Sequence, residues 1–296
     1  MRSSNPVFSR RGFSRDNAYA GAQQPQAGGN PYATGNPYAQ PQQGAANPYA
    51  TNPYAPQDAQ FGAPQQVRGN VMTIDDVVSR TAMTLGTVVV TAVLSWLLLP
   101  VDPANVNKSY AIGVGAGLVA LVLSLIQSFK RKPVPALILA YAAFEGVFLG
   151  VISAAVSTYI ADGVVAQAVL GTMAVFAGVL IAYKMGWIRV TRRFYGFVIA
   201  AAIGFVLLMA VNLLFAVIGG GDGLGFRSGG LGIAFGVIGI ILGACFLALD
   251  FKQVEDGITY GAPREESWLA AFGLTMTLVW IYMEFLRLLS ILQGDD

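Results

Sequence analysis

The chain contains 296 residues, of which 55% are hydrophobic and only 11% are charged, and its net charge is +2. So few polar residues cannot cover the surface of a soluble domain, so the composition predicts a polytopic membrane protein. The chain has no histidine, which excludes histidine-ligated zinc enzymes, serine–histidine proteases and haem ligation by histidine, and its single cysteine, Cys245, excludes a disulfide framework.

The N-terminal segment, residues 1–70, is rich in Gln, Pro, Gly, Ala, Asn and Tyr. The motif NPYA recurs in it, beginning at Asn30, Asn36, Asn47 and Asn52. Such a segment cannot bury enough apolar surface to offset its chain entropy, so we predict a disordered low-complexity tail. The repeat is interpreted either as a linker or as a set of spaced tyrosines that binds a partner.

Residues 71–293 are predicted to form a transmembrane domain of seven helices. Each apolar segment is long enough to cross a bilayer of about 30 Å. The segments are Thr81–Leu99, Ala111–Phe129, Val134–Ile160, Val164–Tyr183, Phe194–Ile218, Leu231–Phe251 and Ser267–Leu292. A cap-like cluster in residues 72–80 (MTIDDVVSR) predicts a short interfacial or entry helix before the first segment. The expected fold is therefore an all-α membrane protein with a disordered N-terminal tail.

Lysine and arginine are distributed unevenly among the loops. The loops that follow the first, third and fifth spans hold only Lys108 and Arg227. The N-terminal flank and the loops that follow the second, fourth and sixth spans hold eleven lysines and arginines: Arg68, Arg80, Lys130, Arg131, Lys132, Lys184, Arg189, Arg192, Arg193, Lys252 and Arg264. By the positive-inside rule, this asymmetry predicts a multi-pass protein of the plasma membrane with a cytoplasmic N-terminus and an external C-terminus. Anionic lipid headgroups account for these cations, so no nucleic-acid partner is expected.

An acid inside a membrane span is costly and is therefore a candidate functional residue. Glu145 lies about twelve residues into the third span, close to mid-bilayer at a rise of ~1.5 Å per residue. The alternative interpretation is a protonated, hydrogen-bonded carboxyl group that only packs.

Asp250 lies near the end of the sixth span. It follows four glycines at helical spacing, Gly232, Gly236, Gly239 and Gly243, which places all five residues on one helix face. A glycine-lined face allows a neighbouring helix to approach closely, so we predict that Asp250 points into the bundle. The alternative is that Asp250 simply ends the span at the interface, because charged residues follow it.

The seventh span carries Glu284 on the same face as Gly273 and Thr277. Arg287 lies three residues further on, where it can form an ion pair with Glu284 along the helix. Such a pair would lower the cost of insertion into lipid, or Arg287 would extend outward to the interface. The other interpretation gives Arg287 a direct role in transport.

Asp250 and Glu284 would repel each other when ionised if they lay close together, so the pair would share a proton near neutral pH or bind a divalent cation. The difficulty for such a pair is that Glu284 lies ~25 Å along its helix from Ser267, which would place it far from Asp250 at the cytoplasmic end of the sixth span. This separation shrinks if residues 267–271 extend into the cytoplasm and if the sixth helix continues through Glu255.

Two stretches, LALDFKQVE (247–255) and VWIYMEFLRLLSIL (279–292), resemble the last two helices of the transmembrane Bax inhibitor motif family, which includes bacterial YccA-like proteins. The resemblance covers about residues 72–293 and leaves the tail outside. It implies seven spans and a carboxylate pair, proposed to be a pH sensor that gates a calcium leak, with Asp250 as the first member and Glu284 in place of the usual second aspartate. It also implies a cationic latch from the end of the second helix to Asp250, for which the candidates are Lys130, Arg131 and Lys132.

The buried acids favour a pH-sensitive cation (calcium) leak channel or a proton-coupled ion exchanger in the lipid bilayer. The alternative is a non-transporting regulator that binds a membrane protease or another membrane complex, which the tyrosine-rich tail supports. We do not expect an enzyme, because no nucleophile motif accompanies the carboxylates. No cofactor is expected other than a calcium ion at Asp250 and Glu284.

Overall fold

The computed structural model describes residues 70–219, 224–226 and 228–294. Within these residues there are seven α-helices, each long and apolar enough to cross a membrane. They are α1 (Ile74–Leu98), α2 (Val106–Phe129), α3 (Pro135–Tyr159), α4 (Val164–Lys184), α5 (Arg192–Gly219), α6 (Gly229–Thr259) and α7 (Glu266–Gly294). The predicted all-α bundle of seven spans is confirmed. The predicted tail lies, apart from residue 70, outside the described residues.

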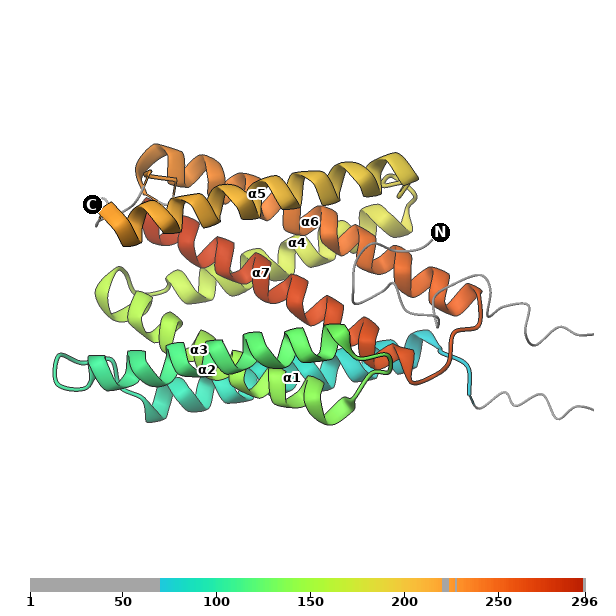
Figure 1. The fold of residues 1–296 in the computed structure, drawn as a ribbon, viewed down its shortest axis with the longest axis horizontal. Coiled ribbons are helices and arrows are strands. Elements are labelled where there is room, and N and C mark those ends of the chain that lie inside the picture. Colours follow the sequence, from blue (N-terminus) through green and yellow to red (C-terminus); the bar gives the residue numbers. More distant parts are fainter. Residues whose placement is uncertain (1–69, 220–223, 227, 295–296) are drawn as a thin grey trace, which may run out of the picture.

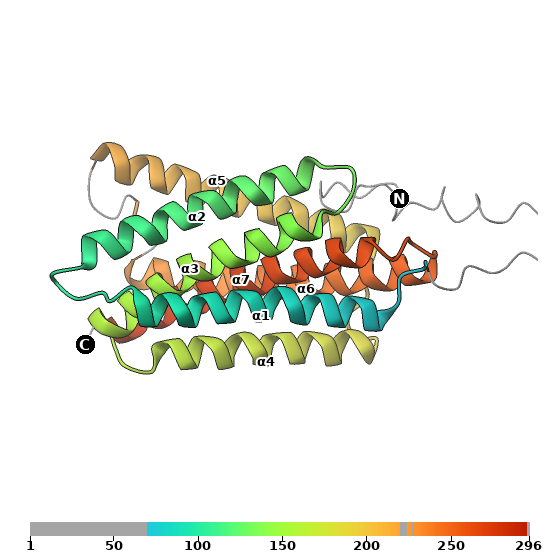
Figure 2. The same ribbon diagram turned by 90° about the horizontal axis from the view of Figure 1, so that it is seen from below.

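Helix α7 occupies the centre of the bundle (Figures 1 and 2). It contacts α1, α3, α4 and α6, whereas α5 packs mainly against α6 at the edge. In the most apolar stretch of α7, 56% of the residues are buried, compared with 17% in α5. The helix that carries Glu284 is therefore enclosed by its neighbours, and α5 presents most of its surface to lipid.

Helices α1, α3, α5 and α7 begin at the end of the bundle where α2, α4 and α6 end (Figure 1, right). The three loops at this end, residues 130–134, 185–191 and 260–265, together with the helix ends next to them, carry eight of the eleven cations that predict a cytoplasmic side. Successive helices therefore cross in alternate directions, as a multi-pass membrane protein requires.

Helix α1 begins earlier than predicted. The Thr73 hydroxyl caps it by accepting a hydrogen bond of 3.2 Å from the backbone N–H of Asp76. The cap predicted at Thr73 is present, but a separate interfacial helix is not formed, because residues 74–80 are the first turns of α1 and lead into the span. No glycine or proline stands between Asp76 and Thr81 to stop the helix, so it continues into the span.

Helix α6 continues two turns beyond its predicted end at Phe251. Lys252 forms ion pairs with Glu255 at 3.1 Å and Asp256 at 3.0 Å, spacings that support a helix exposed to water. The helix stops before Gly261, whose positive φ of 67° ends it in the usual way. The extension places Asp250 within the helix rather than at its end.

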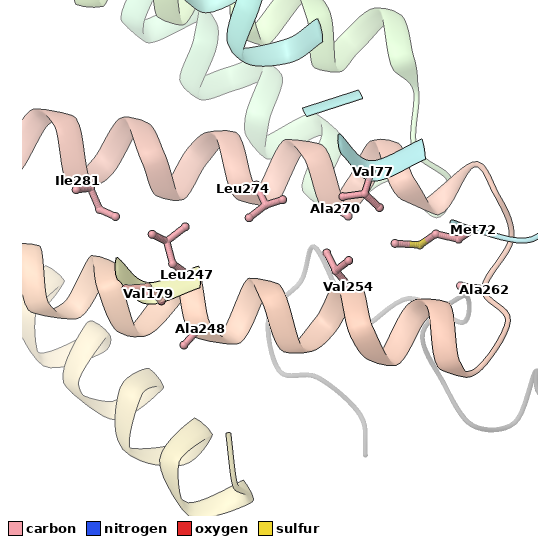
Figure 3. Packing of buried hydrophobic residues seen from close by; sticks show 10 residues of the cluster. All are labelled: Met72, Val77, Val179, Leu247, Ala248, Val254, Ala262, Ala270, Leu274 and Ile281. Atoms are coloured by element: carbon pink, nitrogen blue, oxygen red, sulfur yellow. The ribbon is translucent and has the colours of Figure 1, made fainter. Parts of the chain in front are cut away.

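The α6–α7 interface is the largest buried apolar cluster near Asp250. Figure 3 shows Leu247 and Val254 of α6 facing Ala270, Leu274 and Ile281 of α7. A Cβ atom on Gly243 would lie 2.5 Å from Cγ1 of Ile281, so the two helices approach this closely only because that position is glycine. The glycine face predicted for α6 therefore does contact a neighbouring helix, and that helix is α7.

Candidate functional site

Asp250 points into the bundle, as the glycine spacing predicts. It is 6% exposed, and it accepts a hydrogen bond of 2.6 Å from the Thr277 hydroxyl of α7. No salt bridge among the described residues includes Asp250, since nearby Lys252 pairs with Glu255 and Asp256 instead. Asp250 does not end the helix, because α6 continues past it, and its side chain is buried rather than exposed at the end of the apolar stretch.

Glu284 lies against Gly239 of α6. A Cβ atom on Gly239 would lie 2.8 Å from the carboxyl carbon of Glu284. Glu284 also forms an ion pair with Arg287 on its own helix, and the two side chains are 12% and 11% exposed. The predicted ion pair along the helix is confirmed. Among the described residues, Nε and Nη1 of Arg287 are buried without a hydrogen-bond partner.

The two acids lie at different depths. Asp250 is level with Thr277, and Glu284 is level with Gly239. Gly239 and Asp250 are about three helical turns apart, or ~16 Å, and Thr277 and Glu284 are about two turns apart, or ~10 Å. The directly coupled pair that the resemblance implies is therefore not formed in this conformation, and each carboxylate has its own partner.

A calcium ion needs six to eight oxygen ligands at about 2.3–2.6 Å, so both acids could share one only if they lay much closer together. The described residues contain no cluster of three or more His, Cys, Asp or Glu side chains able to hold a metal. In the described residues, Asp250 and Glu284 therefore stand as single carboxylates at different depths.

Glu145 is half-buried on α3. Helical spacing places it on the same face as Tyr141 and Leu149, which pack against Phe272 and Val279 of α7. The Tyr141 and Phe272 rings meet edge to face at 5.1 Å. Glu145 therefore lies on the side of α3 that faces the central helix. The hydrogen-bonded packing carboxyl considered above finds no bonding partner among the described residues.

The cationic latch predicted at the end of α2 is not formed. Lys130, Arg131 and Lys132 are all exposed, and none pairs with a described carboxylate. They lie in a loop next to α3, and α2 packs mainly on α3, so the α6 carboxylate is out of their reach.

Arg80 of α1 joins the first helix to the residues around the start of α7, a contact that the sequence analysis did not predict. Its guanidinium donates to the Arg264 carbonyl and the Ser267 hydroxyl, and lies 5.3 Å from the centre of the Trp268 ring. Arg264 in turn donates to Asp76 at 2.8 Å. The sequence did contain a sign of this contact: Asp76 and Arg80 lie one turn apart at the start of an apolar helix, where charged side chains require partners.

Three hydroxyl contacts attach α7 to three neighbouring helices. Thr275 bonds to Thr84 of α1 at 2.8 Å, and Tyr282 bonds to Ser153 of α3 at 2.6 Å. Thr277 donates to Asp250 of α6. Of these three, only the last ends on a carboxyl group.

The fold and the site together define a multi-pass membrane protein with acids in its interior. In a comparison with known families, the one described as Bax inhibitor 1 like matches residues 5–294. The chain belongs to this family, whose members are membrane channels or regulators rather than typical enzymes. The match confirms the resemblance found in the last two helices. It also begins within the N-terminal segment, so the prediction that the tail lies outside the resemblance is wrong. No curated protein matched the chain.

Proposed function

We propose that this protein is a pH-sensitive cation (calcium) leak channel or a proton-coupled ion exchanger, and that Asp250 is its gate. The observation that supports this proposal is a carboxylate that is 6% exposed and hydrogen-bonded to Thr277, with no cation beside it among the described residues. An ionised carboxylate in such surroundings is uncompensated, which is costly.

The gate works through the charge on Asp250. While the carboxyl is neutral, Asp250 and Thr277 hold α6 against α7, and the apolar contacts around Leu247 and Leu274 exclude water. Loss of the proton places a charge in this interface, and the interface relaxes by admitting water or a cation. Carboxylate and hydroxyl oxygens are hard ligands of the kind that calcium prefers, so calcium is the proposed substrate. Glu145, on the side of α3 that faces α7, and Glu284 of α7 supply further carboxylates.

The proposed orientation places the loops at residues 130–134, 185–191 and 260–265 in the cytoplasm of the cell. The support is the concentration of lysine and arginine at this end of the bundle. Asp250 then lies on the cytoplasmic half of α6, so its proton exchanges with the cytoplasm.

Calcium flux into liposomes at pH values on either side of neutrality tests the gate. Asp250→Asn keeps the size of the side chain and removes its charge, so we expect the flux to lose most of its pH dependence. Asp102→Asn is the control in an exposed loop. Hydrogen bonds from the Asn105 side chain and backbone hold the pKa of Asp102 below its usual value, so this residue stays ionised throughout the assay.

An unchanged pH profile in Asp250→Asn would show that the gate lies elsewhere. If the wild-type protein gave no flux at either pH, transport itself would be wrong. The non-transporting regulator that binds a membrane protease or another membrane complex would then be the better explanation.

A further inference from the structure

A groove of about 670 Å³ opens between the ends of α4 and α6 and the loop that joins α4 to α5. These elements lie at the end of the bundle where the loop cations gather (Figure 1, right). Its wall is mostly apolar and includes Leu180, Ile188, Val190, Phe251, Val254 and Ile258. The groove therefore lies where a membrane protein meets the headgroup layer, with a surface suited to hydrocarbon.

The charged groups that line the groove are Lys184, Arg189, Lys252 and Glu255. The carboxylate of Glu255 already has two partners, because Lys252 pairs with it at 3.1 Å and the Tyr183 hydroxyl donates to it. Lys184 and Arg189 are exposed, and neither forms a salt bridge with a described acid. Two cations therefore remain available to an anionic ligand.

The loop beside the groove carries features of a membrane interface. Trp187 is 73% exposed and Met185 is 57% exposed, although both are large apolar residues. Tryptophan is favoured at the headgroup level of a bilayer, and basic sites between transmembrane helices on the cytoplasmic side bind anionic headgroups. An apolar wall and free cations at this level match a phospholipid better than they match a soluble anion.

We propose that this groove binds one anionic phospholipid, with its phosphate between Lys184 and Arg189 and an acyl chain along the apolar wall. The lipid would bridge α4 and α6 beside Asp250, because Phe251 lines the groove and packs on Phe176 and Tyr183 of α4 at 5.7 and 5.9 Å between ring centres. Lipid binding here does not depend on transport, so the absence of calcium flux would not contradict the proposed lipid site.

Native mass spectrometry of the purified full-length protein in neutral detergent, titrated with phosphatidylglycerol or phosphatidylcholine, tests the site. Wild-type protein should retain phosphatidylglycerol preferentially. Each cation near a lipid headgroup contributes about 5-fold in affinity, so Lys184→Gln with Arg189→Gln should weaken binding by about 25-fold. The matched control, Arg131→Gln with Lys132→Gln, removes the same charge from another loop at the same end and should weaken binding by less than about 2-fold.

Equal losses in the two double variants would show that only the overall charge matters, and would overturn the site. Equal retention of both lipids by wild-type protein would overturn it without any variant. Inorganic phosphate at millimolar concentration should not displace the lipid, and efficient displacement would indicate a soluble-anion site in place of a lipid site.

Discussion

Asp250 and Lys252 lie two residues apart on α6 and meet opposite environments. Asp250 turns inward to Thr277, and Lys252 turns outward to Glu255 and Asp256. The glycine spacing was sufficient to predict the inward direction, because helical period alone decides which residues share a face. It could not identify the partner, because that depends on the register between two helices.

Gly239→Ala tests the close approach of Glu284. The added Cβ atom would lie 2.8 Å from the Glu284 carboxyl carbon, and the Gly239 carbonyl also accepts a hydrogen bond of 3.2 Å from Trp280. We expect α6 to be pushed away and the free energy of unfolding to fall by about 1–3 kcal/mol, measured as a lower melting temperature in detergent. Gly204→Ala on α5 is the control, because its Cβ atom meets nothing within 4 Å. Equal melting temperatures for the two variants would contradict the packing.

Asp250→Asn and Glu284→Gln should act independently on stability. The two sites are on the order of 10–16 Å apart along the helices and have separate partners. Changes in the free energy of unfolding should therefore add to within about 0.5 kcal/mol in the double variant. Chemical denaturation of the two single variants and the double variant measures this. A larger interaction energy would mean that the carboxylates meet in solution, as the family resemblance implies.

At the scale of helices, the sequence predicts where helices form far better than how two helices are aligned against each other. Apolar length and charged flanks were enough to find all seven helices, with most ends displaced by a few residues. The end of α6 was the largest error, because ion pairs from Lys252 prolong it in water where the apolar pattern stops. The pairing of Asp250 with Thr277 depends on which glycines meet which side chains, and this information is distributed over two helices.

The start of α1 is joined to the loop between α6 and α7. Met72 N–H donates to the Ala262 carbonyl at 2.8 Å, and Arg264 N–H donates to the Asn70 carbonyl at 2.9 Å. Arg80 adds side-chain hydrogen bonds to the same loop. The two helices that carry Asp250 and Glu284 are thus connected at their loop to the first span.

Arg80→Gln should loosen this connection. Hydrogen bonds to charged groups contribute about 1.5–3 kcal/mol, so we expect a loss of about 2 kcal/mol in local stability. Hydrogen exchange of the Arg264 amide reports it and should become at least several-fold faster. Arg131→Gln, in an exposed loop at the same end, should leave this amide unchanged. Similar exchange in both variants would mean that the backbone contacts alone hold the loop.

At the scale of the whole molecule, the central helix is the least apolar of the seven and the most apolar helix, α5, lies at the edge. The order follows from the solvent, because polar side chains need partners inside the protein and apolar ones are satisfied by lipid. Thr275, Thr277 and Tyr282 each bond to a different neighbour. In α7, low hydropathy therefore accompanies the central position.

The orientation of the bundle determines which side of the membrane controls Asp250. With Cys245 replaced by Ala, Lys132→Cys and Ala104→Cys place single thiols at exposed positions on opposite ends of the bundle. A membrane-impermeant maleimide should label Ala104→Cys in intact cells, and Lys132→Cys only after the cells are lysed. The reverse labelling pattern would show that the bundle has the opposite orientation in the membrane. The groove lined by Lys184 and Arg189 would then meet the outer leaflet, and the proton on Asp250 would exchange with the external medium.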